Sequence, residues 1–376
     1  MEKISLSGMT LDELQTVADK AGLARYAAAQ IAHRLYRCHA LTIAEMAELP
    51  AKKRAWLEER YHVGRQSPID ALPSTDGAVK YLFAPAKPAA GRRIETVFIP
   101  AADRGTLCLS SQLGCRMGCR FCMTGRSGFH GNLSPNEILN QLTALDEFGK
   151  GLVTNAVFMG MGEPMDNIEP VLKVLNILTA QWGYGWSSRR ITVSTVGTPE
   201  AGFRRFLAES KARLAVSLHS PFAAERAEWV PAERVFPVKE LIALLKKYDF
   251  GYQRRISFEY ILFKGMNDSQ AHVKELGRLL RAIGGRVNVI GYHPIPGKDG
   301  GFESPSVEQM EEFCNQLNAA GLNATLRASR GVDIHAACGL LSPAPHKKGC
   351  SVAFRSSPDT EKVTAAVPGS STTASG

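Results

Sequence analysis

What the sequence lacks narrows the class of protein before any motif is considered. Its 376 residues contain no apolar run of about eighteen residues, which a membrane-spanning helix would need. The first residues, MEKISLSGMTLDEL, lack the apolar stretch of a secretory signal peptide. No short period repeats along the chain, which argues against a solenoid. These absences predict a cytoplasmic protein with no membrane segment.

Acidic residues are fewer than basic ones. The chain has 45 Lys and Arg against 36 Asp and Glu, which gives a formal net charge of +9. Hydrophobic residues make up 44% of the chain, enough for a sizeable core. A basic balance of this size fits a polyanionic partner, with RNA or DNA as the first candidates.

Cysteine is also sparse, but its placement is informative. The eight cysteines are Cys38, Cys108, Cys115, Cys119, Cys122, Cys314, Cys338 and Cys350. In a large chain without a secretion signal, clustered cysteines indicate a metal site or a catalytic role rather than a disulfide framework. Three of the eight lie within eight residues, at 115, 119 and 122.

The ends of the chain differ in pattern from its middle. Residues 1–66 predict a small helical domain, with a capping box at Thr10–Glu13 and further helices over 26–38 and 42–49. At the other end, residues 344–376 are polar and rich in Ser, Thr and Pro, which predicts a disordered tail.

The middle of the chain predicts a β-rich connector over 67–104 and a barrel domain over 105–343. Strand-like runs occupy 106–111, 154–160, 190–197, 213–219, 256–263, 286–292 and 324–329. Helical segments alternate with them at 134–148, 167–181, 199–210, 237–249, 268–283 and 304–320. Six β–α units in series predict an α/β fold, a parallel sheet curled into a full or partial (β/α)6 barrel with helices outside.

The loop after the first barrel strand carries the sequence Cys115-x3-Cys119-x2-Cys122. Three thiolates can hold a [4Fe–4S] cluster and leave one iron open, and this spacing is the signature of enzymes that generate a radical from S-adenosylmethionine (SAM). The alternative is a structural zinc site completed by His130 or Cys108.

The loops after the other strands also carry unusual residues. In GMGEP, Gly162 allows close approach of a ligand and Glu163 can accept hydrogen bonds from the amino group of SAM. Ser194 and the turn 217–219 could bond its ribose and carboxylate. Each of these residues alone would be read as part of an ordinary β–α turn. Because they all follow strands, they are expected to meet at one end of the barrel.

Taken together, these motifs resemble the RlmN/Cfr family of radical SAM adenosine methyltransferases that act on ribosomal RNA. The resemblance runs from about Leu11 to Leu341 and rests on RIETVFIP, CLSSQLGCRMGCRFCMTG, FMGMGEP, SLHSP, GMND and DIHAACG, in the family's order. It implies a partial barrel with a small N-terminal helical domain. GMGEP and ASRGVDI favour the RlmN branch, which methylates C2 of an adenosine in 23S rRNA and often the adenosine beside the tRNA anticodon. The Cfr branch methylates C8.

The resemblance implies a role for each matching residue. The cluster would lie on Cys115, Cys119 and Cys122. SAM would contact Gly162, Glu163, Ser194, Ser217, Leu218, His219 and His293, the last standing where the family usually has Asn. Cys338 would carry a methyl group, Cys108 would form a transient disulfide with it, and Glu95 would be the proton acceptor. His335 replaces the commoner Asp of the DIDAACG motif.

The implied reaction consumes two SAM molecules per turnover and an electron from a donor such as flavodoxin or ferredoxin. The expected partners are 23S rRNA and tRNA, and the protein is expected to be a monomer. Candidate phosphate contacts are Arg116, Arg120, Arg126, Arg189, Arg190, Arg204, Arg205, Arg254 and Arg255. C8 methylation and a non-catalytic zinc or iron–sulfur RNA-binding module remain the alternatives.

Overall fold

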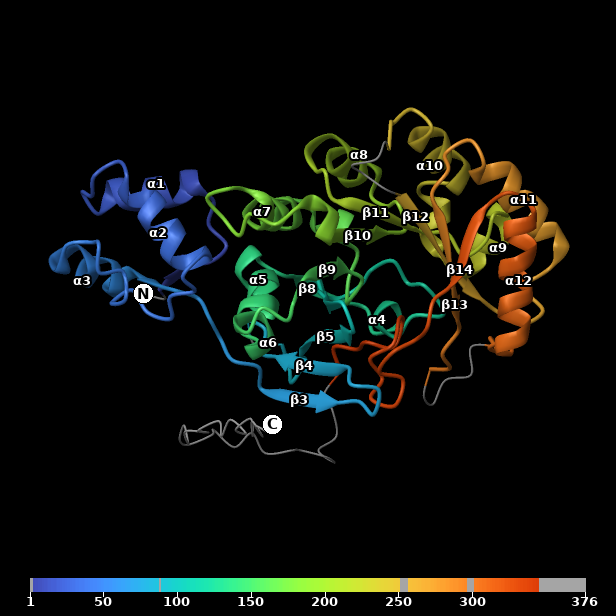
Figure 1. Cartoon of the computed structure of the whole chain (residues 1–376), viewed down its shortest axis with the longest axis horizontal. Helices are drawn as coiled ribbons and strands as arrows, with labels where there is room; N and C mark the ends of the chain where they lie inside the picture. Colours follow the sequence, from blue (N-terminus) through green and yellow to red (C-terminus); the bar gives the residue numbers. More distant parts are fainter. Residues whose placement is uncertain (1–2, 88, 251–255, 296–300, 345–376) are drawn as a thin grey trace, which may run out of the picture.

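A computed structural model describes residues 3–87, 89–250, 256–295 and 301–344 of the chain. Ten strands form one sheet in the order β14-β13-β12-β11-β10-β9-β6-β5-β4-β3 (Figure 1). The parallel part comprises β6 (Arg104–Cys108), β9 (Asn155–Phe158), β10 (Ile191–Thr195), β11 (Arg213–Ser217), β12 (Ile256–Leu262), β13 (Arg286–Gly291) and β14 (Asn323–Leu326). This confirms the α/β fold with a parallel sheet that curves into a partial barrel.

The helices between the parallel strands cover the outside of that sheet (Figure 1). Their apolar faces pack on Val, Ile, Leu and Phe side chains of the strands, which form one large buried core. The helices are α5 (Pro135–Thr143), α6 (Asp146–Gly149), α7 (Ile168–Thr179), α8 (Glu200–Glu209), α9 (Ala223–Trp229), α10 (Val238–Leu245), α11 (Gln270–Leu280) and α12 (Val307–Ala319). Within the described residues, no helix is both long and apolar enough to cross a membrane.

The strands predicted for the connector extend the barrel sheet. β3 (Asp70–Pro73), β4 (Val79–Phe83) and β5 (Ile94–Ala101) pair antiparallel in succession, and β5 pairs antiparallel with β6. The last described segment, drawn in red in Figure 1, returns to this antiparallel part. There Arg93 N–H donates to the carbonyl of Pro343 at 3.0 Å. The strands β3–β5 and the last described residues of the chain are therefore in contact beside the barrel.

The N-terminal residues form α1 (Leu11–Lys20), α2 (Ala27–Tyr36), α3 (Ala51–Arg60) and the strand pair β1 (Ile4–Ser5) and β2 (Tyr61–His62). Thr10 and Glu13 form the predicted capping box. The helix predicted over 42–49 is wrong. Glu45 accepts hydrogen bonds from the Thr42 hydroxyl and from the amides of Leu41 and Thr42, so local side-chain contacts support a turn instead.

Some sequence expectations fall outside the described residues. The predicted tail is described only at residue 344, and Cys350 lies beyond it. Arg254 and Arg255 also lie outside the described ranges. Cys314, read from the sequence as a core residue, is buried in α12.

Candidate active site

The cysteine loop is held by a small hairpin at the end of β6. β7 (Gln112–Gly114) and β8 (Phe129–Asn132) pair antiparallel on either side of the loop and of the short helix α4 (Met123–Arg126). Gly114 has φ +80°, and a Cβ there would lie 1.9 Å from the carbonyl oxygen of Gly128. Glycine is therefore required where the hairpin closes. Cys115 N–H donates to that same carbonyl at 2.9 Å, which fixes the start of the loop.

The three clustered thiols are free and line one cavity of about 140 Å³. Other residues predicted from the sequence line the same cavity, namely Gly162, Glu163, Ser194, Ser217, His219 and Cys338. Leu218 is fully buried beside it without lining it. His130, a candidate ligand in the zinc alternative, is outside the lining and contacts the carbonyl of Ser127 at 2.8 Å.

The pKa values of the three thiols are raised, so a cationic group would be needed to stabilise their thiolate forms. Burial raises the pKa of Cys115, Cys119 and Cys122, and the charge of Cys122 raises the pKa of the other two further. In the described residues, no three Cys, His, Asp or Glu side chains are arranged to hold a single metal ion. Each thiolate of an iron–sulfur cluster binds a different iron, so convergence on one point is not required. The loop is therefore suited to hold a cluster.

The GMGEP loop supplies a buried carboxylate on the same cavity. Glu163 accepts hydrogen bonds from the amides of Met165 and Val196, each at 3.0 Å. Burial raises the pKa of Glu163 to about 7. Gly162 has φ +99°, and a Cβ there would lie 2.5 Å from the Gln112 side chain. A cationic amino group at this position would favour the ionised carboxylate.

Gln112 was missed from the sequence, although it stands in the CLSSQLGC motif. Its Oε1 accepts from Glu163 N–H at 2.9 Å, and its Nε2 donates to Asp166 and Asn132, both at 2.8 Å. Gln112 is fully buried. It thus joins the GMGEP loop to the hairpin that carries the cysteines, a contact between segments about fifty residues apart.

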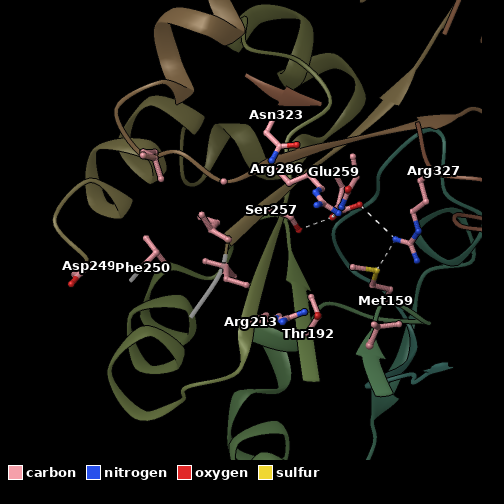
Figure 2. A pocket seen from close by; sticks show the side chains of 16 residues that line it. Met159, Thr192, Arg213, Asp249, Phe250, Ser257, Glu259, Arg286, Asn323 and Arg327 are labelled. Atoms are coloured by element: carbon pink, nitrogen blue, oxygen red, sulfur yellow. Dashed lines mark hydrogen bonds and ion pairs between the residues drawn. The ribbon is translucent and has the colours of Figure 1, made fainter. Parts of the chain in front are cut away.

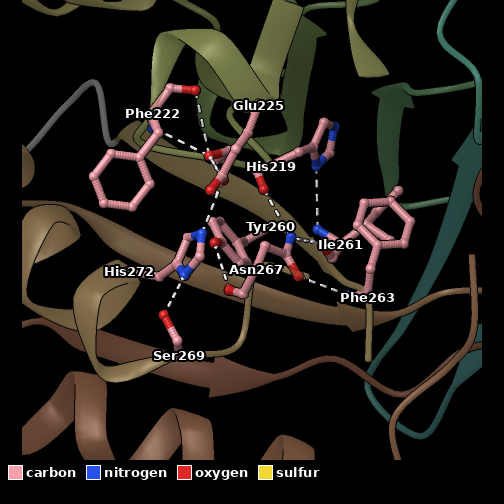
Figure 3. Close-up of polar contacts among 10 residues, drawn as sticks. His219, Phe222, Glu225, Tyr260, Ile261, Phe263, Asn267, Ser269 and His272 are labelled. Atoms are coloured by element: carbon pink, nitrogen blue, oxygen red, sulfur yellow. Dashed lines mark hydrogen bonds and ion pairs between the residues drawn. The ribbon is translucent and has the colours of Figure 1, made fainter. Parts of the chain in front are cut away.

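His219 lies at the end of β11 in a defined protonation state. Its Nδ1 accepts a hydrogen bond from the amide of Ile261 at 3.1 Å, so the ring proton belongs on Nε2 (Figure 3). Burial, assisted by the positive charge of Arg226, lowers the pKa of His219 to about 3. Its backbone has φ +60°, uncommon for a residue with a side chain. A neutral ring with an Nε2–H donor therefore lines the cavity.

A buried asparagine of the GMND motif holds the same turn. Asn267 donates to the carbonyls of His219 and Ile261, both at 2.8 Å, and accepts from Phe263 N–H at 2.7 Å (Figure 3). Tyr260 donates to the Asn267 carbonyl at 2.8 Å. Because Asn267 is completely buried, these contacts link the ends of β11 and β12 beneath the cavity.

A polar group lies between this cavity and a larger one of about 770 Å³. Met159, Glu259 and Arg327 line both cavities. The Arg327 guanidinium lies 3.7 Å from a Glu259 carboxylate oxygen and 3.5 Å from the Met159 sulfur (Figure 2). The neighbouring charges of Cys338, Glu259 and Cys108 raise the pKa of Arg327, with Cys338 the largest influence. Arg327 therefore lies close to both candidate redox cysteines.

The structure also places the two redox candidates near each other. Cys338 is exposed and lines the cavity with the cluster cysteines. Cys108 lies on β6 and is half-buried. Burial raises the pKa of Cys108 to about 12, and the nearby Cys338 contributes to the shift. Two thiols that are about 230 residues apart in the sequence therefore lie close enough to influence each other.

Glu95 and His293 are not among the residues that line the cavity. Glu95, on β5, is fully buried, 3.5 Å from the Lys80 ammonium, and accepts from Ser342 N–H at 3.1 Å. His293 is half-buried, with its Nε2 2.6 Å from the Ser329 hydroxyl. Among the candidate phosphate contacts in the described ranges, Arg116, Arg120, Arg204 and Arg205 form ion pairs with carboxylates.

Comparison with known proteins agrees with this geometry. The Radical SAM superfamily model matches residues 109–297. A relative from Bacteroides fragilis, described as a probable dual-specificity RNA methyltransferase RlmN, is 51% identical over 93% of this chain and 99% of its own. The dual-specificity RNA methyltransferase RlmN of Desulfotalea psychrophila is 40% identical over 91% of this chain and 95% of its own.

A solved structure is similar over the same extent. The radical SAM methyltransferase from Sphaerobacter thermophilus is 40% identical, with a TM-score of 0.81. The match covers 90% of this chain and 98% of that protein.

Proposed function

The chain belongs to the RlmN family and is a radical SAM RNA methyltransferase, and on that basis we propose that it methylates C2 of an adenosine in 23S rRNA. The same site would also modify the adenosine beside the anticodon in tRNA. Adenine C2 lies between two ring nitrogens and is too electron-poor to attack the methyl group of SAM directly. A radical route avoids that difficulty.

The residues that would hold the cofactors are those that share the cavity. Cys115, Cys119 and Cys122 would bind a [4Fe–4S] cluster, whose fit rests on three free thiols that line one cavity, with Cys122 raising the pKa of the other two. When bound, the cluster supplies the electron that cleaves SAM to a 5′-deoxyadenosyl radical. Contacts to SAM are assigned to Gly162, Glu163, Ser194, Ser217, Leu218, His219 and His293.

Cys338 is the residue on which the transferred carbon is first placed. Its thiolate would take a methyl group from one SAM molecule by displacement, and a second SAM would be consumed to remove one hydrogen from that methyl group. The carbon then bonds to C2 and joins the protein to RNA. Glu95 would accept the proton lost from C2, and the electron lost with that proton would return to the iron–sulfur cluster. Cys108 would attack the Cys338 sulfur and form a disulfide, which breaks the bond from that sulfur to the carbon. The released CH2 group takes up one proton, equivalent to the one lost by the Cys108 thiol, and becomes the methyl group of the RNA.

One observation carries this proposal: Cys338 lines the same cavity as the three cluster cysteines. The influence of Cys338 on the pKa of Cys108 supports their pairing. Glu95 does not line the cavity, and its carboxylate contacts Lys80 and Ser342 instead. As a proton acceptor it would therefore require the Cys338 segment to shift when RNA binds.

The remaining expectations rest on the sequence and on the family. The electron donor would be a flavodoxin or ferredoxin, the protein would act as a monomer, and its location would be the cytoplasm. The division into segments 1–66, 67–104, 105–343 and 344–376 also remains a proposal.

The decisive experiment is anaerobic incubation with SAM, a reductant and protein-free 23S rRNA, followed by mass spectrometry of the nucleosides and of the Cys338 peptide. We expect 2-methyladenosine in the RNA and a methyl group on Cys338. Methylation at C8 would instead assign the Cfr reaction. Colourless protein that contains zinc and leaves the RNA unmodified would indicate the non-catalytic RNA-binding alternative.

A further inference from the structure

The segment that carries Cys338 crosses the antiparallel strands, and a buried ion pair lies beneath it. Lys80 on β4 and Glu95 on β5 have side chains that are 1% and 0% exposed, with Nζ and Oε1 3.5 Å apart. A buried ion pair is weak evidence for stability, because desolvation of two charges offsets their attraction. Its position beside a reactive segment therefore calls for a reason other than fold stability.

Each member of the pair holds one flank of Cys338. The Lys80 ammonium donates to the carbonyl of His335 at 3.3 Å, three residues before the cysteine. Glu95 Oε2 accepts from Ser342 N–H at 3.1 Å, four residues after it. His335 has φ +51°, an uncommon backbone conformation for a residue with a side chain. The ammonium thus holds the carbonyl of a strained residue.

Other side-chain and loop contacts fix the ends of the segment, while its centre has backbone hydrogen bonds from His335 N–H to Val332 and from Ala336 N–H to Gly331. Asp333 accepts from the Ser74 hydroxyl at 2.5 Å and from Thr75 N–H at 3.0 Å. The carbonyl of Gly339 accepts from Met123 N–H at 2.7 Å. His335 lies between these two anchors, and Lys80 is the side chain that reaches it from the sheet.

The sheet register relates Lys80 to the second cysteine. Lys80 is paired with Val97, and Val97 is paired on its other side with Cys108. Paired residues on adjacent strands point to the same face of the sheet, so the side chains of Lys80 and Cys108 point to the same face. Their strands are separated by one strand, which places their backbones roughly 10 Å apart. Because Lys80 holds the His335 carbonyl from the same face of the sheet as Cys108, it also sets the position of Cys338 relative to Cys108.

We propose that Lys80 is a positioning residue for Cys338: with Glu95 it forms a buried clamp on both flanks of the cysteine and holds it opposite Cys108. This inference rests on the proposed roles of Cys338 and Cys108. The clamp ties the proton acceptor and the methyl carrier into one unit, because the carboxylate of Glu95 contacts the backbone of the segment that carries the methyl group. Lys80 itself need not touch SAM or RNA.

The test uses the full-length, cluster-containing protein and three variants. Lys80→Met removes the ammonium with little change in volume. Lys80→Met/Glu95→Gln removes both charges but keeps an acceptor for Ser342 N–H, so it leaves no unpaired buried charge. Lys264→Met is the matched control, because Lys264 and Glu303 are also 3.5 Å apart but are exposed.

The first measurement is hydrogen exchange of the peptide 331–343, followed by mass spectrometry. In both Lys80 variants we expect amides 335–338 to exchange at least about tenfold faster, while the double variant keeps the protection of Ser342. Iron content and the exchange of the β9–β12 core should match the wild type. The Lys264→Met protein should exchange like the wild type throughout.

The second measurement is the equilibrium between the Cys108–Cys338 disulfide and glutathione under anaerobic conditions. Loss of the clamp should lower the effective concentration of the two thiols about tenfold, whereas a residue that merely stabilises the fold would leave that equilibrium unchanged. Unchanged exchange at 335–338 in a folded Lys80 variant would overturn the proposal. Should Lys80→Met fail to fold, the double variant decides by the same criterion.

These outcomes separate the clamp from the proposed function. Neither readout involves methyl transfer to RNA. If the wild type forms no Cys108–Cys338 disulfide, the proposed redox pairing fails, while the exchange of 335–338 still supports or overturns the clamp.

Discussion

Cys108 is the residue whose replacement gives the most distinctive outcome. If it resolves the link between RNA and Cys338, the Cys108→Ala variant should bind the cluster, methylate Cys338 and cleave SAM, but stall with RNA bound covalently to Cys338. No other thiolate is expected to reach that sulfur, since attack requires a thiol aligned with the bond it cleaves. A denaturing gel of anaerobic reactions with labelled RNA should show a shifted band.

The control for that experiment is Cys314→Ala, which removes a buried thiol of α12 outside the family motifs. It should give free methylated RNA and no shifted band. Free methylated RNA from Cys108→Ala as well would remove Cys108 from the mechanism. Replacement of Cys338 in addition to Cys108 should abolish the adduct.

His219 should make stability depend on pH. Its folded pKa, about 3, lies below the unfolded value of 6.5, so the unfolded chain takes up a proton first as the pH falls. The contribution of neutral His219 to the free energy of unfolding is complete above about pH 6.5 and is lost toward pH 3, at about 1.4 kcal/mol per pH unit.

His219→Gln keeps an acceptor for Ile261 N–H but cannot titrate. Between pH 6.5 and 4.5 the wild type should therefore lose about 2 kcal/mol more stability than this variant, measured by chemical denaturation. The exposed His62 supplies the control: His62→Gln should follow the wild-type curve. Parallel curves for wild type and His219→Gln would refute the assignment of a neutral, buried ring.

Which residues could be identified from the sequence depended on their local motifs. The cysteine spacing and the GMGEP loop pointed to residues that do share a cavity. Gln112, Asn267, Arg327 and Lys80 were missed, because their contacts join segments distant in sequence and a single polar residue in or near a strand gives no local signal. The same limitation applies to Glu95, whose burial against Lys80 depends on the register of β4 and β5.

At the scale of elements, Asn267 should couple β11 to β12. Asn267→Ala would leave the Phe263 amide and the His219 and Ile261 carbonyls without their partner, at a cost of about 3 kcal/mol in stability. The loosened turn should also weaken SAM binding. Chemical denaturation and equilibrium dialysis of SAM with the cluster-containing variant measure the two effects.

The matched substitution for that prediction is Asn176→Ala on the exposed face of α7. It should change stability by less than about 0.5 kcal/mol and leave SAM binding intact. Unchanged stability in Asn267→Ala would mean that the ends of the two strands are held by other contacts.

Strands and helices of the barrel followed from hydrophobic periodicity, because a buried parallel strand and an amphipathic helix differ in period and length. Two features of the fold could not be predicted from hydrophobic periodicity. The turn at Thr42–Glu45 shares a capping pattern with helices, yet the helix forms after Pro50 instead. The sequence of the antiparallel strands did not indicate which barrel strand they pair with, since pairing partners depend on the whole sheet.

For the molecule as a whole, the formal net charge of +9 should make RNA binding sensitive to salt. Each phosphate contact releases counterions, so affinity for a 23S rRNA fragment should fall at least about tenfold between about 50 and 200 mM monovalent salt. Filter binding measures this effect. SAM binding at the same salt concentrations is the control and should change less than about twofold, and an RNA affinity independent of salt would contradict phosphate recognition.

The site also has an order of assembly. The turn Ser74–Asp76 bonds Arg330, Gly331 and Asp333, residues made some 255 positions later. During synthesis the cluster cysteines emerge long before the cysteine that is proposed to carry the methyl group, and β3–β5 remain uncovered until residues 330–333 have been made. Contacts this distant in sequence fold slowly. A nascent chain thus presents the proposed cluster loop first and gains the proposed methyl-carrying cysteine only about two hundred residues later.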